Sequence, residues 1–317
     1  MEYRALGKTG LKVSAVGVGC WQMGGVVDHR GWTGVSDEES IALIHRAREL
    51  GVNLLDTAEG YGGGHSEEVI GRAIAGIRDE FVISSKVRPL VDACSEDEAK
   101  TRIREACEGS LRRLNTDHID VYLLHAEPYE PTQAAVIAAF EELREQGKIR
   151  AFGISTNDID ISRTLMAYGD LSVLEVGYSL LELETEKTLS FAAENGLGTL
   201  IRKPLASGTL TGKYFGKKPD LEKDDLRYGQ LNSERGQEVL DQLQDLLFLT
   251  REGQRSMVQA ALRYILDTVG VTAVIPGAKN RQQLEDNVGA ANAPALTQEE
   301  RDRALEITRN IGPFRAF

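Results

Sequence analysis

The stretch that decides the fold is Asn53-Leu54-Leu55-Asp56-Thr57-Ala58-Glu59-Gly60-Tyr61-Gly62. In it, a short apolar run ends in an aspartate, and a tyrosine follows five residues later among glycines. The next two apolar runs along the chain end beside Lys86 and His125. Because three successive runs each end beside such a side chain, we expect the four polar residues to meet at one end of a set of parallel strands.

Together these side chains are what a proton donor to a carbonyl group needs. A phenol has an unperturbed pKa of about 10. A nearby ammonium such as Lys86 favours the phenolate and lowers that pKa, and a carboxylate such as Asp56 keeps the ammonium charged. An imidazole such as His125 can hydrogen-bond a substrate oxygen and orient it. Each residue alone also has an ordinary structural explanation, but their joint position favours a catalytic site.

Eight short β-branched runs alternate with longer amphipathic segments. The runs are residues 14–19, 52–55, 81–85, 119–124, 150–154, 173–176, 198–201 and 271–275. Capping boxes predict helix starts at Ser36/Glu39, Ser95/Glu98 and Thr297/Glu300. Gly51 and Gly147 are placed to end helices. This alternation predicts a single α/β domain over residues 1–317, a (β/α)8 TIM barrel whose floor is closed by a hairpin at residues 3–13.

The connection between the seventh and eighth runs is the longest in the chain. Its extra segment, residues 203–235, is rich in Gly, Lys and Asp and leaves the seventh strand at its C-terminal end. In a barrel that end is the active-site face. We therefore expect this extended loop to be a lid or a strap over a cofactor, with a surface excursion as the alternative.

Composition restricts the classes of partner. A net charge of −12 argues against nucleic-acid and anionic-membrane partners. No run approaches the ~18 apolar residues of a membrane span, and the first residues lack an apolar secretory core. Three cysteines without CxxC spacing indicate reduced thiols in a cytoplasm. Five histidines without a His/Cys cluster argue against a metal site.

A second group of residues indicates a dinucleotide. The stretch that ends the eighth strand and opens a helix is Ile275-Pro276-Gly277-Ala278-Lys279-Asn280-Arg281. A helix N-terminus offers unpaired N–H groups to an anion, and Lys279 and Arg281 add charges suited to the 2′-phosphate of NADP. Glycines between residues 204 and 212 let backbone approach a pyrophosphate. No GxGxxG follows the first strand, so the two-layer Rossmann mode is not indicated.

Across nearly its whole length the sequence resembles the aldo-keto reductase family, in its bacterial branch of sugar- and aldehyde-acting members. The matching motifs are, in chain order, residues 7–14, 56–62, 65–67, Lys86, His125, 153–155, 178–179 and 275–277. The resemblance implies that Tyr61 is the general acid. It also implies that Lys86 and Asp56 tune that acid and that His125 orients the carbonyl.

The resemblance further implies an NADP(H) site. The implied contacts are Ser155, Tyr178, Leu205, Ser207, Leu210, Gly277, Lys279, Arg281, Gln283 and Asn287. Ser155 would hold the nicotinamide carboxamide and Tyr178 would stack on the ring. Leu205, Ser207 and Leu210 would belong to the strap over the pyrophosphate. Gln283 and Asn287 would lie near the adenine.

Three positions depart from the family pattern. Thr156 follows Ser155 where many members have asparagine, Glu175 stands where glutamine is usual, and Gly277 stands where some members have lysine. The four catalytic positions are intact. The preference for NADP therefore depends on Lys279 and Arg281.

The expected function is reduction of an aldehyde, ketone or sugar carbonyl to the alcohol by NADP(H), with Tyr61 as proton donor. Two alternatives share the fold: a cofactor-binding regulatory subunit, and a sugar dehydrogenase working in the oxidative direction. The chain lacks the set of carboxylate and histidine ligands that a barrel isomerase or a metal-dependent hydrolase would need. The loops that select the substrate hold Trp21, His29, Arg30, Trp32, Arg88, Glu127 and Tyr129. Trp21 is the expected pocket wall, and neither the substrate nor the oligomeric state is predicted.

Overall fold

The computed structural model describes residues 1–27, 30–31, 35–223, 225–312 and 314. Two of the expected substrate-loop residues, His29 and Trp32, lie outside the described residues, as does the side chain of Arg30.

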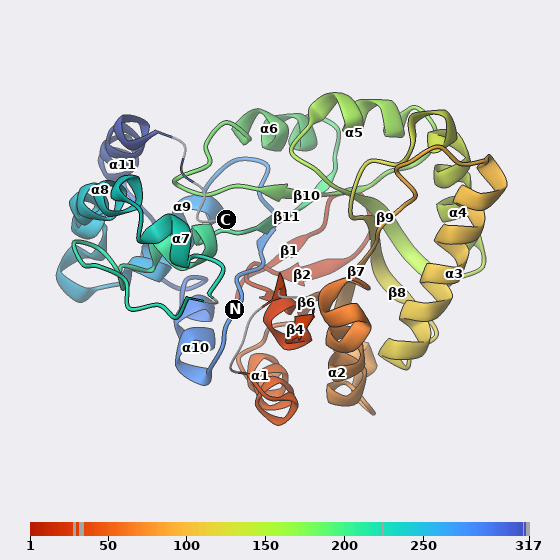
Figure 1. Cartoon of the computed structure of the whole chain (residues 1–317), viewed down its shortest axis with the longest axis horizontal. Coiled ribbons are helices and arrows are strands. Elements are labelled where there is room, and N and C mark those ends of the chain that lie inside the picture. The colour runs from red at the N-terminus through yellow and green to blue at the C-terminus, as the bar shows by residue number, and fades with distance from the viewer. Residues whose placement is uncertain (28–29, 32–34, 224, 313, 315–317) are drawn as a thin grey trace.

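Eight parallel strands form one sheet in the order β12-β11-β10-β9-β8-β7-β6-β3. Their bounds are β3 (Val18–Gly19), β6 (Leu54–Asp56), β7 (Val82–Val87), β8 (Ile119–Leu124), β9 (Ile149–Ser155), β10 (Val173–Gly177), β11 (Gly198–Arg202) and β12 (Ala273–Val274). Parallel bridges from Val16 to Val274 and from Gly19 to Gly277 join the two edges. The sheet therefore closes into a (β/α)8 barrel (Figure 1), which confirms the predicted fold class, and each predicted run overlaps one strand of this sheet.

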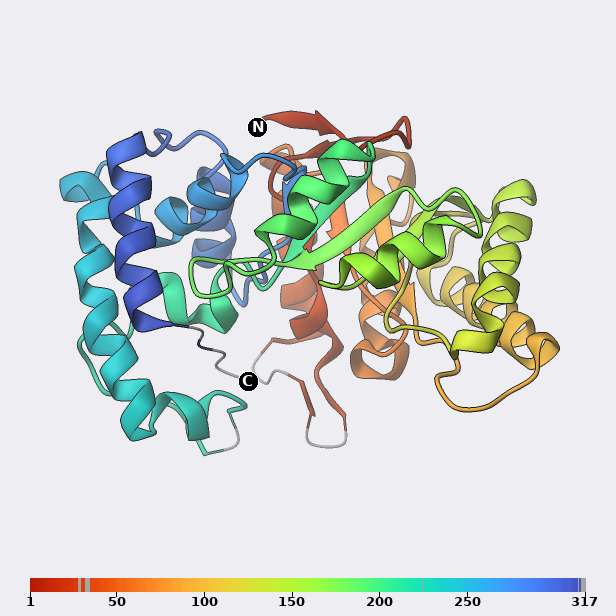
Figure 2. The same cartoon turned by 90° about the horizontal axis from the view of Figure 1, so that it is seen from above.

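The strands read as apolar runs because they are buried on both faces, as every residue of β7 and β8 is. An antiparallel hairpin, β1 (Tyr3–Ala5) and β2 (Lys12–Ser14), lies at the N-terminal end of the barrel. Leu6, Leu11 and Val13 of this hairpin region pack with the side chains that fill the barrel interior. The hairpin thus closes the floor, as predicted, and Figure 2 shows it at one end of the molecule.

The main helices have the bounds α1 (Asp37–Glu49), α2 (His65–Ala73), α3 (Glu96–Leu114), α4 (Gln133–Glu145), α5 (Ile159–Met166), α6 (Glu186–Glu194), α9 (Met257–Leu266), α10 (Arg281–Gly289) and α11 (Gln298–Ile311). The capping boxes at Ser36, Ser95 and Thr297 are formed as predicted. Gly51 and Gly147 follow α1 and α4 with φ of +82° and +73°, the conformation that ends a helix.

The long connection before β12 is more structured than the sequence analysis expected. It contains α7 (Tyr228–Leu231), α8 (Glu234–Gln242) and the 3-10 segment η6 (Leu243–Gly253), so the insertion continues beyond residue 235. These elements form because their apolar side chains, Val239, Leu240, Leu243, Leu246 and Leu249, are fully buried in the main hydrophobic core. A short hairpin of β4 (Val26–Val27) and β5 (Arg30–Gly31) was also not predicted. Within the described residues, no helix is both long and apolar enough to cross a membrane.

Candidate active site

The four expected catalytic side chains come from the C-terminal ends of three adjacent strands. Asp56 is the last residue of β6, Lys86 lies near the end of β7, and His125 directly follows β8. Tyr61 begins the 3-10 turn η2 (Tyr61–Gly64) in the loop after β6. The parallel register places these strand ends side by side, so the barrel brings the predicted group together.

The turn that carries Tyr61 depends on a glycine. Gly62 has φ of +64°, and a Cβ atom there would lie 2.0 Å from the carbonyl oxygen of Gly24. This close approach packs η2 against η1 (Trp21–Gly24), the turn that follows β3. As a result the ring centroid of Trp21 lies 6.2 Å from that of Tyr61, so the residue expected as a pocket wall stands beside the phenol.

Lys86 connects the carboxylate to the phenol. Its Nζ donates to both carboxylate oxygens of Asp56 at 2.8 and 2.7 Å, and to the carbonyl oxygen of Thr57 at 2.9 Å. The same Nζ lies 3.4 Å from the hydroxyl of Tyr61. Lys86 is fully buried and Asp56 is 3% exposed. Because water cannot screen these charges, their effect on the phenol is strong.

Burial and charge set the protonation states of Tyr61 and His125. Burial raises the pKa of Tyr61, and the Lys86 ammonium opposes that rise, so the phenol keeps its proton at neutral pH. The effect of the lysine has the predicted sign, but the loss of solvation is larger. Burial lowers the pKa of His125 to about 4, with Lys86 adding to the effect, so the imidazole is neutral. The His125 ring meets the Tyr61 ring edge-on, with centroids 5.7 Å apart.

Glu175, which the sequence analysis noted only as a departure from the family pattern, also reaches this lysine. Its Oε2 lies 3.1 Å from Lys86 Nζ, and its Oε1 accepts a hydrogen bond of 3.2 Å from the hydroxyl of Ser155. Burial, followed by the charge of Glu175, raises the pKa of Asp56 to about 7. Burial alone would lower the pKa of Lys86, but Asp56 and Glu175 outweigh it and raise that pKa, so the ammonium stays charged.

The two residues expected around the nicotinamide, Ser155 and Tyr178, differ in how deeply they are buried. Ser155 ends β9 with a half-buried side chain that contacts Glu175. Asn157, which the sequence analysis did not assign, accepts from the backbone N–H of Gly177 at 2.8 Å and from Arg202 at 3.0 Å. It therefore ties together the ends of β9, β10 and β11. Tyr178 is fully buried, with its ring centroid 6.5 Å from that of Tyr264 in the core, so the expected stacking residue has no exposed ring face.

The first helical element of the strap is the 3-10 segment η5 (Ala206–Thr211), which follows β11 after three residues. Ser207 is half-buried with φ of +58°, and its carbonyl oxygen accepts from Arg227 at 3.3 Å. Of the two strap leucines, Leu205 is 9% exposed and Leu210 is fully buried. The contact between Arg227 and Ser207 joins the far part of the strap to its start.

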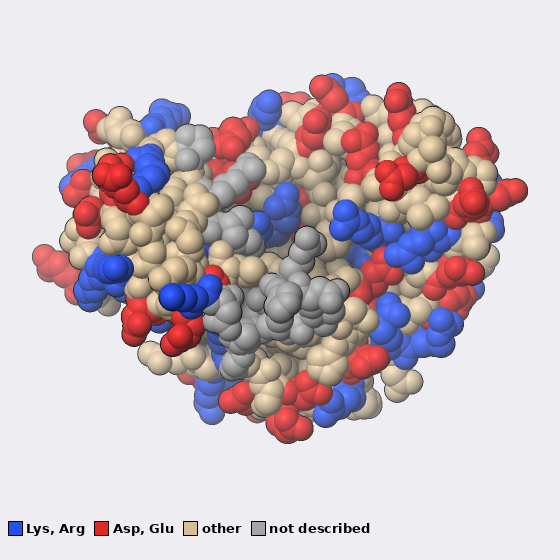
Figure 3. Space-filling view, in the orientation of Figure 1, with Lys and Arg blue, Asp and Glu red and all other residues tan. Residues whose placement is uncertain are grey.

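Lys279 lies near two cations that the sequence analysis did not assign, Arg227 and Lys213 of the strap. Burial lowers the pKa of Lys279, and the charges of Arg227 and Lys213 add to that effect, while Asp225 opposes it. Figure 3 shows Lys and Arg side chains beside a hollow in this face of the molecule. Lys213 and Arg227 thus act by charge on Lys279, and Arg227 is also paired with Asp225 at 2.7 Å. A group of cations suits a phosphate. For Arg227 and Lys213, the only signal in the sequence was the high Lys content of the strap.

The remaining expected contacts lie on or near α10. Arg281 has a side chain 68% exposed and donates to Glu285 at 2.7 Å. Gln283 accepts from the backbone N–H of Lys279 at 2.8 Å, and Asn287 donates to the carbonyl oxygen of Gly277 at 3.1 Å. Gln283 and Asn287 therefore hold the loop that presents Lys279.

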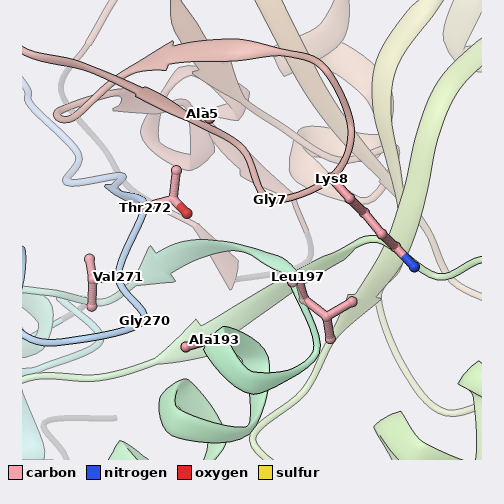
Figure 4. A pocket seen from close by; sticks show the side chains of 9 residues that line it. Ala5, Gly7, Lys8, Ala193, Leu197, Gly270, Val271 and Thr272 are labelled. Carbon is pink, nitrogen blue, oxygen red and sulfur yellow. The ribbon is translucent and has the colours of Figure 1, made fainter.

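A surface hollow of about 480 Å³ lies away from this group, at the floor of the barrel (Figure 4). Its lining residues are Ala5, Gly7, Lys8, Ala193, Gly196, Leu197, Gly270, Val271 and Thr272. Lys8, its one ionisable side chain, forms an ion pair of 2.6 Å with Asp170. Because this one ionisable side chain is already paired, the lining offers no acid–base pair.

Comparison with known proteins agrees with this architecture. The sequence model described as "Aldo/keto reductase family" matches residues 15–308. Aldo-keto reductase YhdN of Bacillus subtilis (strain 168) is 35% identical over 295 residues, which cover 90% of this chain and 87% of that protein. NADH-specific methylglyoxal reductase of Escherichia coli (strain K12) is 31% identical over 335 residues, which cover 96% of this chain and 100% of that protein.

Solved structures match as well. Glycerol dehydrogenase AKR11B4 from Gluconobacter oxydans has a TM-score of 0.85 and 28% identity, over 98% of this chain and 96% of that chain. An aldo-keto reductase from Klebsiella pneumoniae in complex with NADPH has a TM-score of 0.73 and 26% identity, over 99% and 96% of the two chains. Both matches cover nearly the whole barrel.

Proposed function

Because the chain belongs to the aldo/keto reductase family, we propose that it reduces the carbonyl of an aldehyde, ketone or sugar with NADPH, and that Tyr61 donates the proton. Family membership makes the chain an oxidoreductase that uses a nicotinamide cofactor. The proton donor, the preference for NADPH and the kind of carbonyl substrate are the parts we propose.

The observation that carries this proposal is the continuous contact from Asp56 through Lys86 to Tyr61. A phenol that keeps its proton at neutral pH can give it to an oxygen on which negative charge develops. The buried ammonium 3.4 Å from that phenol then stabilises the phenolate that is left. The neutral imidazole of His125 would donate a hydrogen bond to the same substrate oxygen and orient it beside Tyr61.

A bound nicotinamide would supply the hydride, and the residues at the two ends of the site suit such a cofactor. Ser155 and the buried Glu175 offer a hydroxyl and a carboxylate for an amide group near the phenol. Lys213, Arg227 and Lys279 offer cations for a phosphate at the strap. One relative is named for NADH and one neighbour was solved with NADPH, so the choice of cofactor rests on this chain's own cations.

A turnover assay tests the proposed function. With a generic aldehyde such as 4-nitrobenzaldehyde, we expect the purified protein to consume NADPH faster than NADH at equal, subsaturating cofactor concentration. Added divalent metal should leave the rate unchanged. A protein that binds NADPH but turns over no member of a panel of aldehydes, ketones and sugars would instead fit the regulatory-subunit alternative.

Replacing Lys279 by alanine should weaken NADPH binding by about 1.5–3 kcal/mol, the range for a hydrogen bond to a charged group. Binding of NADH, which lacks the 2′-phosphate, should change little. Arg281→Ala is the matched control and should have a smaller effect, because Arg281 is already paired with Glu285 and more exposed. The dissociation constants of both cofactors can be measured by titration calorimetry. An equal loss for NADH and NADPH would contradict a 2′-phosphate contact at Lys279.

A further inference from the structure

The buried charges around Tyr61 do not balance. Asp56 and Glu175 contribute two carboxylates, whereas Lys86 contributes one ammonium, and all three residues are at most 3% exposed. Both carboxylates lie within 3.1 Å of the same Nζ. The site therefore holds either one net negative charge or one additional proton, and a positive group beside it favours the first of these states.

One oxygen of this group has no hydrogen-bond donor among the described residues. Glu175 Oε2 is buried and close to Lys86 Nζ in distance, but the ammonium approaches it outside the angle of a hydrogen bond. A buried acceptor without a donor is costly, and such an atom in a native protein calls for an explanation, of which a functional role is one. The other oxygen of the same carboxylate is bonded to Ser155.

We propose that Glu175 makes this site bind the oxidised nicotinamide cofactor at least as tightly as the reduced one, because its charge favours the oxidised form. The inference rests on the proposed function, because it takes Ser155 as the residue beside the nicotinamide. The ring carries a positive charge when oxidised and none when reduced. A buried carboxylate bonded to Ser155 therefore stabilises the oxidised form selectively.

On the enzyme, the same charge favours carbonyl reduction, because that reaction ends with the oxidised cofactor bound. In reduction, a carbonyl, the reduced cofactor and one proton give an alcohol and the oxidised cofactor, and Tyr61 is the group that gives the proton to the substrate oxygen. Glu175 would lower the free energy of the state that ends this reaction. It acts by charge on the bound cofactor and takes no part in the proton transfer.

The test is to measure dissociation constants of NADP⁺ and NADPH, by titration calorimetry, for the unmodified protein, Glu175→Gln and Glu182→Gln. Glutamine keeps the size of Glu175 and an oxygen for Ser155 while removing the charge. Glu182→Gln is the matched control, because it removes a carboxylate that bonds Asn157 at 3.2 Å. We expect the unmodified protein to bind NADP⁺ at least as tightly as NADPH. Glu175→Gln should raise the ratio of the NADP⁺ to the NADPH constant tenfold or more.

An unchanged ratio in Glu175→Gln, or an equal shift in Glu182→Gln, would overturn the inference while leaving the proposed function in place. Tighter binding of NADPH than of NADP⁺ by the unmodified protein would also overturn the inference. This measurement does not depend on whether a variant folds. If the unmodified protein bound neither form, the proposed function would fail first, so the two failures are distinguishable.

Discussion

Replacing Tyr61 by phenylalanine should slow hydride transfer to a carbonyl substrate by about 10²–10⁴-fold, the usual contribution of general-acid catalysis. In free energy this is roughly 3–5 kcal/mol of activation barrier. The change removes one hydroxyl and keeps the ring that packs beside Trp21 and His125. Fold and NADPH affinity should therefore survive, and the loss should appear in the chemical step.

Single-turnover kinetics with saturating NADPH measure that step directly. Tyr122→Phe is the matched control, because Tyr122 is fully buried against Phe140 in the core that surrounds the barrel. The control makes the same chemical change and should leave the rate of hydride transfer unchanged. If Tyr61→Phe kept a rate within about threefold of the parent, a barrier change below 1 kcal/mol, another group would be the acid. His125 would then be the next candidate.

The barrel and the meeting of Asp56, Tyr61, Lys86 and His125 could be predicted because both follow from local patterns. Parallel strands buried on two faces read as apolar runs, and residues at the ends of neighbouring runs must meet at one edge. Asp56, Lys86 and His125 were found in this way. Tyr61 needed one further condition, the turn at Gly62, which the glycine-rich sequence after it already indicated.

The contact between Glu175 and Lys86 could not be predicted from such patterns. Their strands, β10 and β7, are separated in the sheet by β8 and β9. The two side chains meet only because the closed barrel turns them toward one interior, a consequence of curvature that no local pattern encodes. By contrast, the pairing of Glu175 with Ser155 follows from the register of adjacent strands.

Contacts made by the strap could not be predicted from local sequence patterns either. Its composition, rich in Gly, Lys and Asp, indicated a lid or strap on the active-site face, but Arg227 is 52 positions from Lys279 in the chain. Only the fold places their charges together. The burial of Tyr178 has a related cause, since its ring packs on Tyr264 of α9, a helix that follows the strap.

The replacement of Lys86 by methionine should have two large effects at once. The phenol loses the ammonium that stabilises its phenolate, so hydride transfer should slow by about 10²–10⁴-fold, as in the loss of the acid itself. The variant also leaves the carboxylates of Asp56 and Glu175 buried without a cation. Removing one partner of a buried ion pair typically costs about 3–5 kcal/mol of folding free energy.

Arg78→Met is the matched control for stability. Arg78 pairs at 2.7 Å with Asp120, a carboxylate 1% exposed near the start of β8, at the end of the barrel opposite the catalytic group. Asp120 keeps a second partner, Arg150, at 2.8 Å. The control should therefore destabilise the fold by less than Lys86→Met and should leave hydride transfer unchanged.

The two effects of Lys86→Met can be separated by experiment. Urea unfolding with and without NADPH gives the free energy of unfolding, and single-turnover kinetics on the folded fraction give the rate. Lowering the pH should recover stability in Lys86→Met, because protonation of Asp56, whose pKa burial already raises, removes part of the uncompensated charge. It should not recover the rate, since no ammonium returns. A variant as stable as the parent at neutral pH would contradict the charge arrangement described for the buried group. A variant with unimpaired hydride transfer would contradict the role of Lys86 in tuning Tyr61.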